Sequence, residues 1–241
     1  MPTVSFVIPA YNEEQLLGST LTAIAHAARA QQLAFEMIVV DDASGDHTSE
    51  VARLHGARVL CVNFRQIAAT RNAGARESSG EWLVFVDADT TIGPDVLREA
   101  VTALQEGAAG GGCALRFDGR VPRYGRVLIA LILPVYRALG LAAGCFLFCT
   151  RQAFDAVGGF DESLFAAEEA VLSRALRRQG RFVLLRAAVL TSARKLRAHS
   201  AREVMWTLLR LAFIGPRAVR RRDGLDLWYG QRRADPEEHD R

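Results

Sequence analysis

The chain has 241 residues, of which 50% are hydrophobic and 24% are charged, and its formal net charge is +3. This length suits one α/β domain with a short appendage, and the composition excludes bulk disorder. The mild charge gives little support for nucleic-acid binding. The four cysteines show neither a metal-binding spacing nor a paired framework, and the N-terminus has no leader-like pattern, so we expect a cytoplasmic protein.

The first half of the chain alternates apolar runs with amphipathic segments. Short apolar runs bounded by turn residues predict strands at residues 4–8, 37–40, 58–62 and 82–86. Apolar residues at helical spacing predict helices between them, capped at Asn12 and lying over residues 48–55 and 68–77. This alternation predicts an α/β fold with a Rossmann-like, mostly parallel central sheet flanked by helices.

The second half of the chain is less regular. Gly93-Pro94-Asp95 is expected to start a helix, and residues 113–117 are expected to form a strand. Pro134 and Arg137 interrupt an apolar run, which favours a buried helix and then a strand over residues 145–150 instead of a membrane span. The remaining expected elements are a helix opened by Glu168-Glu169, short strands at 182–185 and 189–190, a helix from His199 to about Arg222 and a polar tail beyond Asp235.

Acidic pairs follow two of the predicted strands. Asp41-Asp42 ends one strand, and Asp87-Ala88-Asp89 follows another. Ligands of open α/β sheets bind beyond the carboxyl ends of the strands, where acids can hold a base, a ribose or a metal such as Mg²⁺ or Mn²⁺. Taken alone, the D-x-D motif fits solvated turn aspartates equally well. The glycine-rich Rossmann motif and the Walker A motif are both missing, which disfavours dinucleotide binding and P-loop chemistry.

Five short motifs occur in a characteristic order. They are residues 6–14 (FVIPAYNEE), 39–48 (VVDDASGDHT), 69–74 (ATRNAG), 86–89 (VDAD) and 158–162 (GGFDE). With this order and spacing, residues 2–195 resemble the inverting nucleotide-sugar glycosyltransferases of family 2, which have the GT-A fold. The resemblance implies a GT-A glycosyltransferase domain over residues 1–195. The composition of residues 196–241 predicts a basic amphipathic helix followed by a polar tail.

The resemblance also implies which residues bind the nucleotide sugar. Asp42 matches the acid that hydrogen-bonds the base, and Asp89, together with Asp87, matches the ligands of a divalent cation, Mn²⁺ or Mg²⁺, on the diphosphate. The other matching residues are Pro9, Tyr11, Glu13, Arg71, Ala88, Arg194 and Lys195. Arg65 is an alternative contact to the phosphates, and His199 is a candidate for a further metal ligand.

Glu168 and Glu169 match the family's Glu-Asp pair, whose second acid is the usual general base. Glu169 stands where Asp is commoner, so Glu168 remains an alternative base. The implied reaction is a single displacement at the anomeric carbon with inversion. A carboxylate deprotonates the acceptor hydroxyl, and the metal offsets charge on the leaving nucleoside diphosphate.

Three other functions fit parts of this sequence less well. Asp87 to Thr91 also satisfies the D-x-D-x-T motif of haloacid-dehalogenase-like phosphatases, but that motif belongs on a first strand. A sugar-phosphate nucleotidyltransferase needs a glycine-rich basic loop after its first strand, and residues 9–12 are not one. A non-catalytic sugar-nucleotide-binding module would lack the base that Glu168 and Glu169 supply.

The late segment from Arg194 to Arg222 holds nine basic residues and one acid, Glu203. Its helix can lie on an anionic membrane and deliver the enzyme to a lipid-linked acceptor, or it can pack on the catalytic domain; the sequence leaves both open. The expected partners are therefore a UDP-, GDP- or dTDP-linked sugar, an acceptor that can be lipid-linked, and the inner face of a membrane, without nucleic acid.

Overall fold

The computed structural model describes residues 3–214, 219–225, 229–230 and 235. The strands are β1 (Val4–Ala10), β2 (Phe35–Asp42), β3 (Arg58–Val62), β4 (Trp82–Val86), β5 (Thr90–Thr91), β6 (Gly110–Phe117), β7 (Phe146–Thr150) and β8 (Phe182–Thr191). They form one sheet in the order β3-β2-β1-β4-β7-β6-β8-β5. The pairs β1–β2, β1–β4, β2–β3 and β6–β8 are parallel, whereas β7 and β5 run against their neighbours. The predicted mostly parallel sheet is confirmed.

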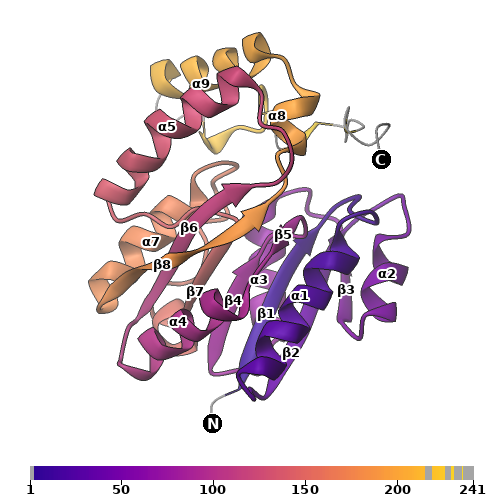
Figure 1. Ribbon diagram of the computed structural model, residues 1–241, viewed down its shortest axis with the longest axis vertical. Coiled ribbons are helices and arrows are strands. Elements are labelled where there is room, and N and C mark those ends of the chain that lie inside the picture. The colour runs from indigo at the N-terminus through magenta and orange to yellow at the C-terminus, as the bar shows by residue number, and fades with distance from the viewer. Residues whose placement is uncertain (1–2, 215–218, 226–228, 231–234, 236–241) are drawn as a thin grey trace.

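Helices cover both faces of this sheet (Figure 1). They are α1 (Leu17–Ala30), α2 (Thr48–Leu54), α3 (Ile67–Glu77), α4 (Pro94–Gln105), α5 (Arg123–Ala138), α6 (Arg151–Ala156), α7 (Glu168–Gln179), α8 (Arg194–Ala198) and α9 (Ala201–Ile214). Alternate residues of each strand face opposite layers. Phe6 and Ile8 therefore belong to the hydrophobic cluster that includes α1 and α4, while Val7 belongs to the cluster on the other face, which includes α3, α6 and α7.

The approach of α3 to the sheet depends on Gly74. A Cβ at this position would overlap the side chain of Val7 and would lie 2.8 Å from Cγ2 of Val40. The missing side chain therefore lets α3 pack tightly on β1 and β2. This tight packing fixes where the amino-terminal half of α3 lies relative to the carboxyl ends of the strands.

Two sequence predictions about element boundaries are wrong. The first helix begins at Leu17, not at Asn12, because Asn12 has a left-handed φ of 50°. Its Oδ1 instead accepts a hydrogen bond from the backbone N–H of Gly45, so Asn12 ties two loops together. The two short strands expected after residue 181 are one strand, β8, which pairs with β6 across an irregularity between Gly112 and Ala114.

The helix expected to be buried after residue 127 is the largest departure from the sequence analysis. In α5 only Gly125 is fully buried, and several large apolar side chains face outwards. The late basic segment also differs, because His199 has an extended backbone that separates α8 from α9. Part of the predicted helix to Arg222 and the tail beyond Asp235 lie outside the described residues. Within the described residues, no helix is both long and apolar enough to cross a membrane.

Candidate active site

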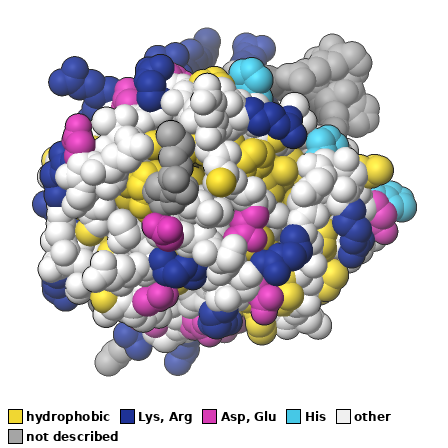
Figure 2. Space-filling view, turned by 90° about the horizontal axis from the view of Figure 1, so that it is seen from below, with side chains coloured by type: hydrophobic (Ala, Val, Ile, Leu, Met, Phe, Trp, Pro, Cys, Tyr) yellow, Lys and Arg dark blue, Asp and Glu magenta, His cyan; other side chains and the backbone are white. Residues whose placement is uncertain are grey.

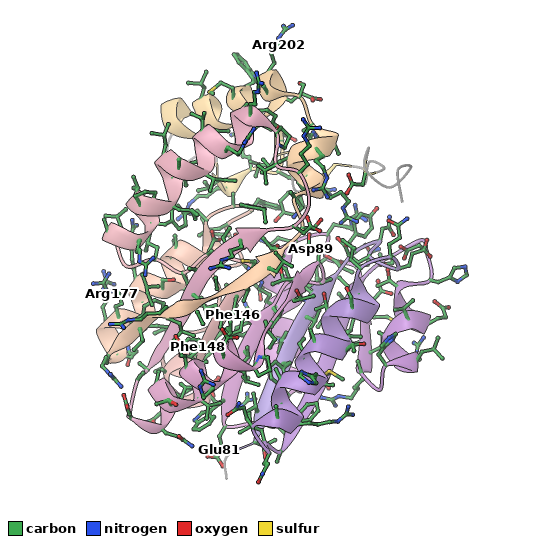
Figure 3. All side chains as sticks on the ribbon, viewed as in Figure 1. Glu81, Asp89, Phe146, Phe148, Arg177 and Arg202 are labelled. Atoms are coloured by element: carbon green, nitrogen blue, oxygen red, sulfur yellow. The ribbon has the colours of Figure 1, made fainter. Side chains whose placement is uncertain are left out.

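The carboxyl ends of β1, β2 and β4 meet at one edge of the sheet, because these strands are parallel neighbours. Asp89 lies at this edge, and Glu81 lies at the opposite end of β4 (Figure 3). Two contacts hold the D-x-D loop: Thr20 Oγ1 donates to the carbonyl of Ala88 at 2.9 Å, and Ser192 N donates to the carbonyl of Asp89 at 3.1 Å. The loop is therefore fixed from both α1 and the segment after β8.

Arg71 joins the D-x-D loop to the first turn of α7. Its side chain is only 2% exposed, and its Nη2 donates to Asp87 Oδ1 and to the carbonyl of Gly144, both at 2.8 Å. Its Nη1 donates to Glu168 Oε1 at 2.9 Å. Burial works against the charged guanidinium, but the carboxylates of Asp87 and Glu168 outweigh it and raise the pKa of Arg71. One cation thus brings together three segments that are distant in the sequence.

Glu168 and Glu169 have different surroundings. Glu168 is buried and is committed to Arg71. Glu169 is half-buried. Its δ and γ carbons would lie 3.5 and 3.6 Å from a Cβ at Gly144, so its side chain runs alongside this glycine. Burial, and then repulsion from Glu168, raises the pKa of Glu169 to about 8. The carboxyl of Glu169 therefore gains and loses its proton near pH 8, which is a property of candidate general bases.

Tyr136 of α5 lies in the field of the same two acids. Burial, followed by the charges of Glu169 and Glu168, raises the pKa of its phenol to about 12. The phenol therefore stays protonated and can donate a hydrogen bond towards this part of the site. Through Tyr136, α5 contributes to the surroundings of the candidate base.

Asp42 organises the loop between β3 and α3. Its carboxylate accepts from the backbone N–H groups of Phe64, Arg65 and Gln66, and from the hydroxyl of Thr70, at 2.7 to 3.1 Å. These four donors account for about the full accepting capacity of a carboxylate. The observed role of Asp42 is to hold this loop, and its contact with a nucleobase stays a prediction.

The loop held by Asp42 places Arg65 against the loop after β1. Arg65 has a left-handed φ of 51°, and its guanidinium carbon lies 3.5 Å from the centroid of the Tyr11 ring. A cation stacked on an aromatic face at the mouth of the site is a flat surface on which a base can lie. The sequence points to both residues, and the structure brings them together; Pro9 lies half-buried near the end of β1, just before this loop.

Arg194 connects the end of the described fold to the loop after β1. Its Nη2 lies 2.8 Å and 2.7 Å from the two carboxylate oxygens of Glu13, and both side chains are buried. Burial opposes the charge, but Glu13 and then Asp89 raise the pKa of Arg194. Arg194 therefore lies within the field of the D-x-D motif, and Lys195 follows it, half-buried, on α8.

Asn72, from the motif at residues 69–74, and His199 have structural roles. Asn72 holds the glycine turn: its Nδ2 donates to the carbonyl of Phe160 and its Oδ1 accepts from Phe160 N, both at 2.9 Å. The backbone carbonyl of His199 accepts the hydroxyl of Tyr124 at 2.9 Å, which joins α5 to the start of α9. The imidazole of His199 as a metal ligand stays a prediction.

The donor set at the D-x-D motif fits a hard divalent cation. Asp89 is half-buried, and Asp87 keeps 24% of its side chain exposed although Oδ1 binds Arg71. Carboxylate oxygens are the ligands that Mg²⁺ and Mn²⁺ prefer. Among the described residues, no group of three or more His, Cys, Asp or Glu could hold a metal without help. A cation here would need oxygen atoms from a phosphate or from water as well.

The sequence analysis missed the groups that surround the acids. These groups come from distant segments of the chain: they are Tyr136, the carbonyl of Gly144 and the ring of Phe160. The centroid of the Phe160 ring lies 5.2 Å from the Arg71 guanidinium carbon. No local spacing reveals contacts of this range. The apolar run that contains Tyr136 was the only available signal, and it indicated burial.

Comparison with known proteins shows the family to which this chain belongs. Residues 5–158, more than half of the chain, match the model of Glycosyl transferase family 2. Validoxylamine A glucosyltransferase of Streptomyces hygroscopicus subsp. limoneus is 35% identical over 132 residues, which are 51% of this chain and 29% of that protein. The undecaprenyl-phosphate 4-deoxy-4-formamido-L-arabinose transferase of Pseudomonas paraeruginosa is 34% identical over 161 residues, 62% of this chain and 47% of that protein. The chain thus spans between about a third and about half of these relatives.

Solved structures show the same fold. A mannosyltransferase from Pyrobaculum calidifontis, in complex with GDP-Man and Mn²⁺, superposes with a TM-score of 0.65 at 21% identity, covering 88% of this chain and 62% of that one. Glucosyl-3-phosphoglycerate synthase from Mycobacterium tuberculosis superposes with a TM-score of 0.57 at 23% identity, covering 86% and 79%. The GT-A fold expected from the sequence is confirmed. By its sequence motifs and its family match, the chain belongs to glycosyl transferase family 2.

Proposed function

We propose that this chain transfers a glycosyl group from a nucleoside-diphosphate sugar to an acceptor hydroxyl, with inversion. The observation that carries the proposal is the bridge through Arg71, which brings Asp87 of the D-x-D motif and the glutamate pair of α7 to one place. Transfer needs these two groups close together, because the leaving diphosphate and the attacking hydroxyl lie on opposite sides of one anomeric carbon.

The nucleotide half of the proposed site is the edge formed by β1, β2 and β4. The Tyr11 ring stacked with Arg65 would receive the base, and Arg194 would approach the diphosphate. Asp89, assisted by Asp87, would hold Mn²⁺ or Mg²⁺, which offsets the negative charge of the leaving group when bound. A related fold holds GDP-Man with Mn²⁺ and another holds UDP with Mn²⁺, which supports this donor class.

Glu169 is the proposed general base. Glu168 is tied to Arg71, whereas the carboxyl of Glu169 has only its own backbone N–H as a hydrogen-bond partner among the described residues. A base with a raised pKa accepts the acceptor proton more readily than an ordinary carboxylate does. In this scheme Arg71 and Glu168 position α7, and Glu169 takes the proton.

The proposed acceptor is lipid-linked, and the proposed location is the inner face of a membrane. One relative is named as an undecaprenyl-phosphate transferase, which supports this acceptor class. The described helices do not cross a membrane. Contact with the lipid would therefore be peripheral for the described part of the chain.

The deciding experiment is a thermal-shift screen of UDP, GDP and dTDP with Mn²⁺ or Mg²⁺, followed by an assay of nucleoside diphosphate release from the matching sugar. Asp89→Ala should abolish the metal-dependent part of the stabilisation. Glu81→Ala is the matched control, because Glu81 is exposed at the other end of the same strand. Equal metal-dependent shifts in the two variants would refute the metal assignment. Phosphate release from a simple monoester would favour the phosphatase alternative.

A further inference from the structure

Helix α5 exposes an apolar stripe to the solvent. Val127, Leu131 and Val135 recur at every fourth position and share one face of the helix, with Ile132 and Leu139 beside them. These five side chains are between 38% and 64% exposed. Single exposed apolar residues are ordinary, but a continuous stripe of them marks a surface that contacts something else.

The opposite face of α5 is already occupied. Its inward side chains Leu133 and Tyr136 line a cavity of about 80 Å³ together with Cys113, Ala114, Leu115, Arg137, Leu141, Ala143, Leu184 and Leu185. The helix therefore packs on β6 and β8 through its inner face. The outer stripe is not needed for that packing and remains available for a partner.

The start of α9 continues the exposed surface. The hydroxyl of Tyr124 donates to the carbonyls of Leu196 and His199, which ties the first turn of α5 to the junction of α8 and α9. Figure 1 shows α5 and α9 together at one end of the molecule. Met205, Trp206 and Leu209 of α9 are exposed there, and Trp206 is 71% exposed. A tryptophan beside an aliphatic stripe is typical of surfaces that lie at a membrane interface.

The charged side chains of α5 and of residues 119–122 before it are basic, whereas Glu203 at the start of α9 is an exposed acid that accepts hydrogen bonds from Ser200. The sequence has no acidic residue between Asp118 and Asp155, whereas exposed arginines occur at positions 120, 123, 126 and 137. Arg202 of α9 points away from the molecule at the same end (Figure 3). At the opposite end, acidic and basic side chains are interspersed (Figure 2). The combination of an apolar stripe with flanking arginines complements an anionic lipid surface.

We propose that the outer face of α5, extended by the start of α9, docks on an anionic lipid bilayer. Docking itself depends only on this face. The purpose of docking, which is to bring a lipid-linked acceptor to Glu169, rests on the proposed function. A second copy of the chain fits this face less well, because a two-fold contact would bring Arg123 and Arg126 against their own copies if the helices run parallel, or against Arg137 of the copy if they run antiparallel. The inner face of the docked helix carries Tyr136 towards the base.

The test is co-sedimentation of the full chain with vesicles of phosphatidylglycerol and, in parallel, of phosphatidylcholine, without any sugar nucleotide. The chain should bind the anionic vesicles and bind the neutral ones far more weakly. The double variant Leu131→Gln/Val135→Gln should lower partitioning into anionic vesicles by about tenfold or more, because it removes two apolar side chains that would be buried in the bilayer on docking. Arg123→Gln/Arg126→Gln should lower it and remove most of its salt dependence.

Two matched controls separate this face from general stickiness. Leu54→Gln removes an apolar side chain that is 84% exposed on α2, and Arg53→Gln removes an exposed charge on the same helix; neither should change vesicle binding. Binding that is absent, or that the α5 variants leave unchanged, would overturn the proposal. The proposal would also be overturned if sedimentation velocity showed that the chain dimerises with increasing concentration and that Leu131→Gln abolishes this dimerisation. Sugar-nucleotide binding, measured on the same samples, reports separately on the proposed function.

Discussion

Arg194 and Glu13 are separated by 181 residues, yet Nη2 of the arginine lies 2.7 Å from Oε2 of the glutamate. Both side chains are buried. Glu13 belongs to the loop after the first strand and Arg194 opens the helix after the last one. This ion pair therefore closes the nucleotide side of the site by joining the two ends of the sheet domain.

Removing one partner of this pair should destabilise the protein strongly. Glu13→Gln leaves the guanidinium of Arg194 buried without its compensating charge, which should cost about 3 kcal/mol of unfolding free energy. Urea denaturation measures the loss. Glu106→Gln is the control, because it breaks an ion pair with Arg181 in which both side chains are at least half exposed, and it should cost less than about 1 kcal/mol. Equal losses would show that the buried pair has no special role.

The bridge through Arg71 should show coupling between its partners. Arg71→Met leaves Glu168 buried and unpaired, and should cost about 3 kcal/mol. Glu168→Gln should cost less. The double variant should be more stable than the sum of the two single losses predicts, by about 1 kcal/mol or more, because the neutral glutamine does not need the cation. Strict additivity in chemical denaturation would contradict a direct interaction.

The raised pKa of Glu169 predicts the pH dependence of transfer. A base works in its deprotonated form, and its pKa is raised to about 8. We therefore expect kcat/KM to increase with pH between about pH 7 and about pH 9 and then to level off. Glu169→Gln should lower kcat by about 10²- to 10⁴-fold while nucleoside diphosphate binding is kept. If Glu168→Gln alone removes turnover and Glu169→Gln keeps it, the base has been assigned to the wrong residue.

The same carboxyl predicts a pH-dependent stability. Because the folded-state pKa of Glu169 is raised from 4.5 to about 8, the proton binds more tightly to the folded chain than to the unfolded one. Its stabilising contribution is complete below about pH 4.5 and is lost as the pH rises to about 8. Glu169→Gln should therefore be more stable than the parent at pH 8.5, by on the order of 1 kcal/mol, and the difference should be smaller at pH 6. Melting temperatures of the two proteins at both pH values measure this difference. A difference in stability that does not change with pH would contradict the raised pKa of Glu169.

Tight packing of α3 predicts a large effect from one methyl group. Gly74→Ala should destabilise the fold by about 1–3 kcal/mol, because the new Cβ overlaps Val7 and crowds Val40. Gly45→Ala is the control: no atom lies within 4 Å of its added Cβ, and its φ is not in the left-handed region. Thermal unfolding of both variants is the measurement. Equal melting temperatures would mean that α3 can move away from the sheet at little cost.

The regular half of the fold could be predicted from the sequence because each of its elements has a local signal. The apolar run of β4 (Trp82–Val86) and its following acids marked both a buried strand and its ligand-binding end. The helix start predicted at Asn12 is wrong because asparagine both caps helices and tolerates a left-handed backbone. The hydrogen bond with Gly45, which the local sequence does not reveal, favours the left-handed turn. Contacts such as Arg71 with Glu168, 97 residues apart, have no local signal at all.

The apolar run that forms α5 was misread for a physical reason. Hydrophobicity shows that a segment avoids water, but it does not show whether protein or lipid covers it. The inner residues Leu133 and Tyr136 behave as predicted for a packed helix, while Leu131 and Val135 do not. A helix with apolar residues on two faces can contact a different partner with each face, and a single sequence identifies neither.

The position of α5 between β6 and β7 has a consequence for how such proteins diversify. Gly112 of β6 pairs directly with Leu147 of β7, and because these neighbouring strands are antiparallel, the segment that contains α5 leaves the sheet after Phe117 and re-enters it at Phe146 on the same end of the two strands. Lengthening or replacing a segment that starts and ends together costs little closure entropy and leaves the strand register intact. The segment around α5 can therefore change in length or sequence while the register of the sheet, and with it the positions of Asp87 and Asp89, stays the same.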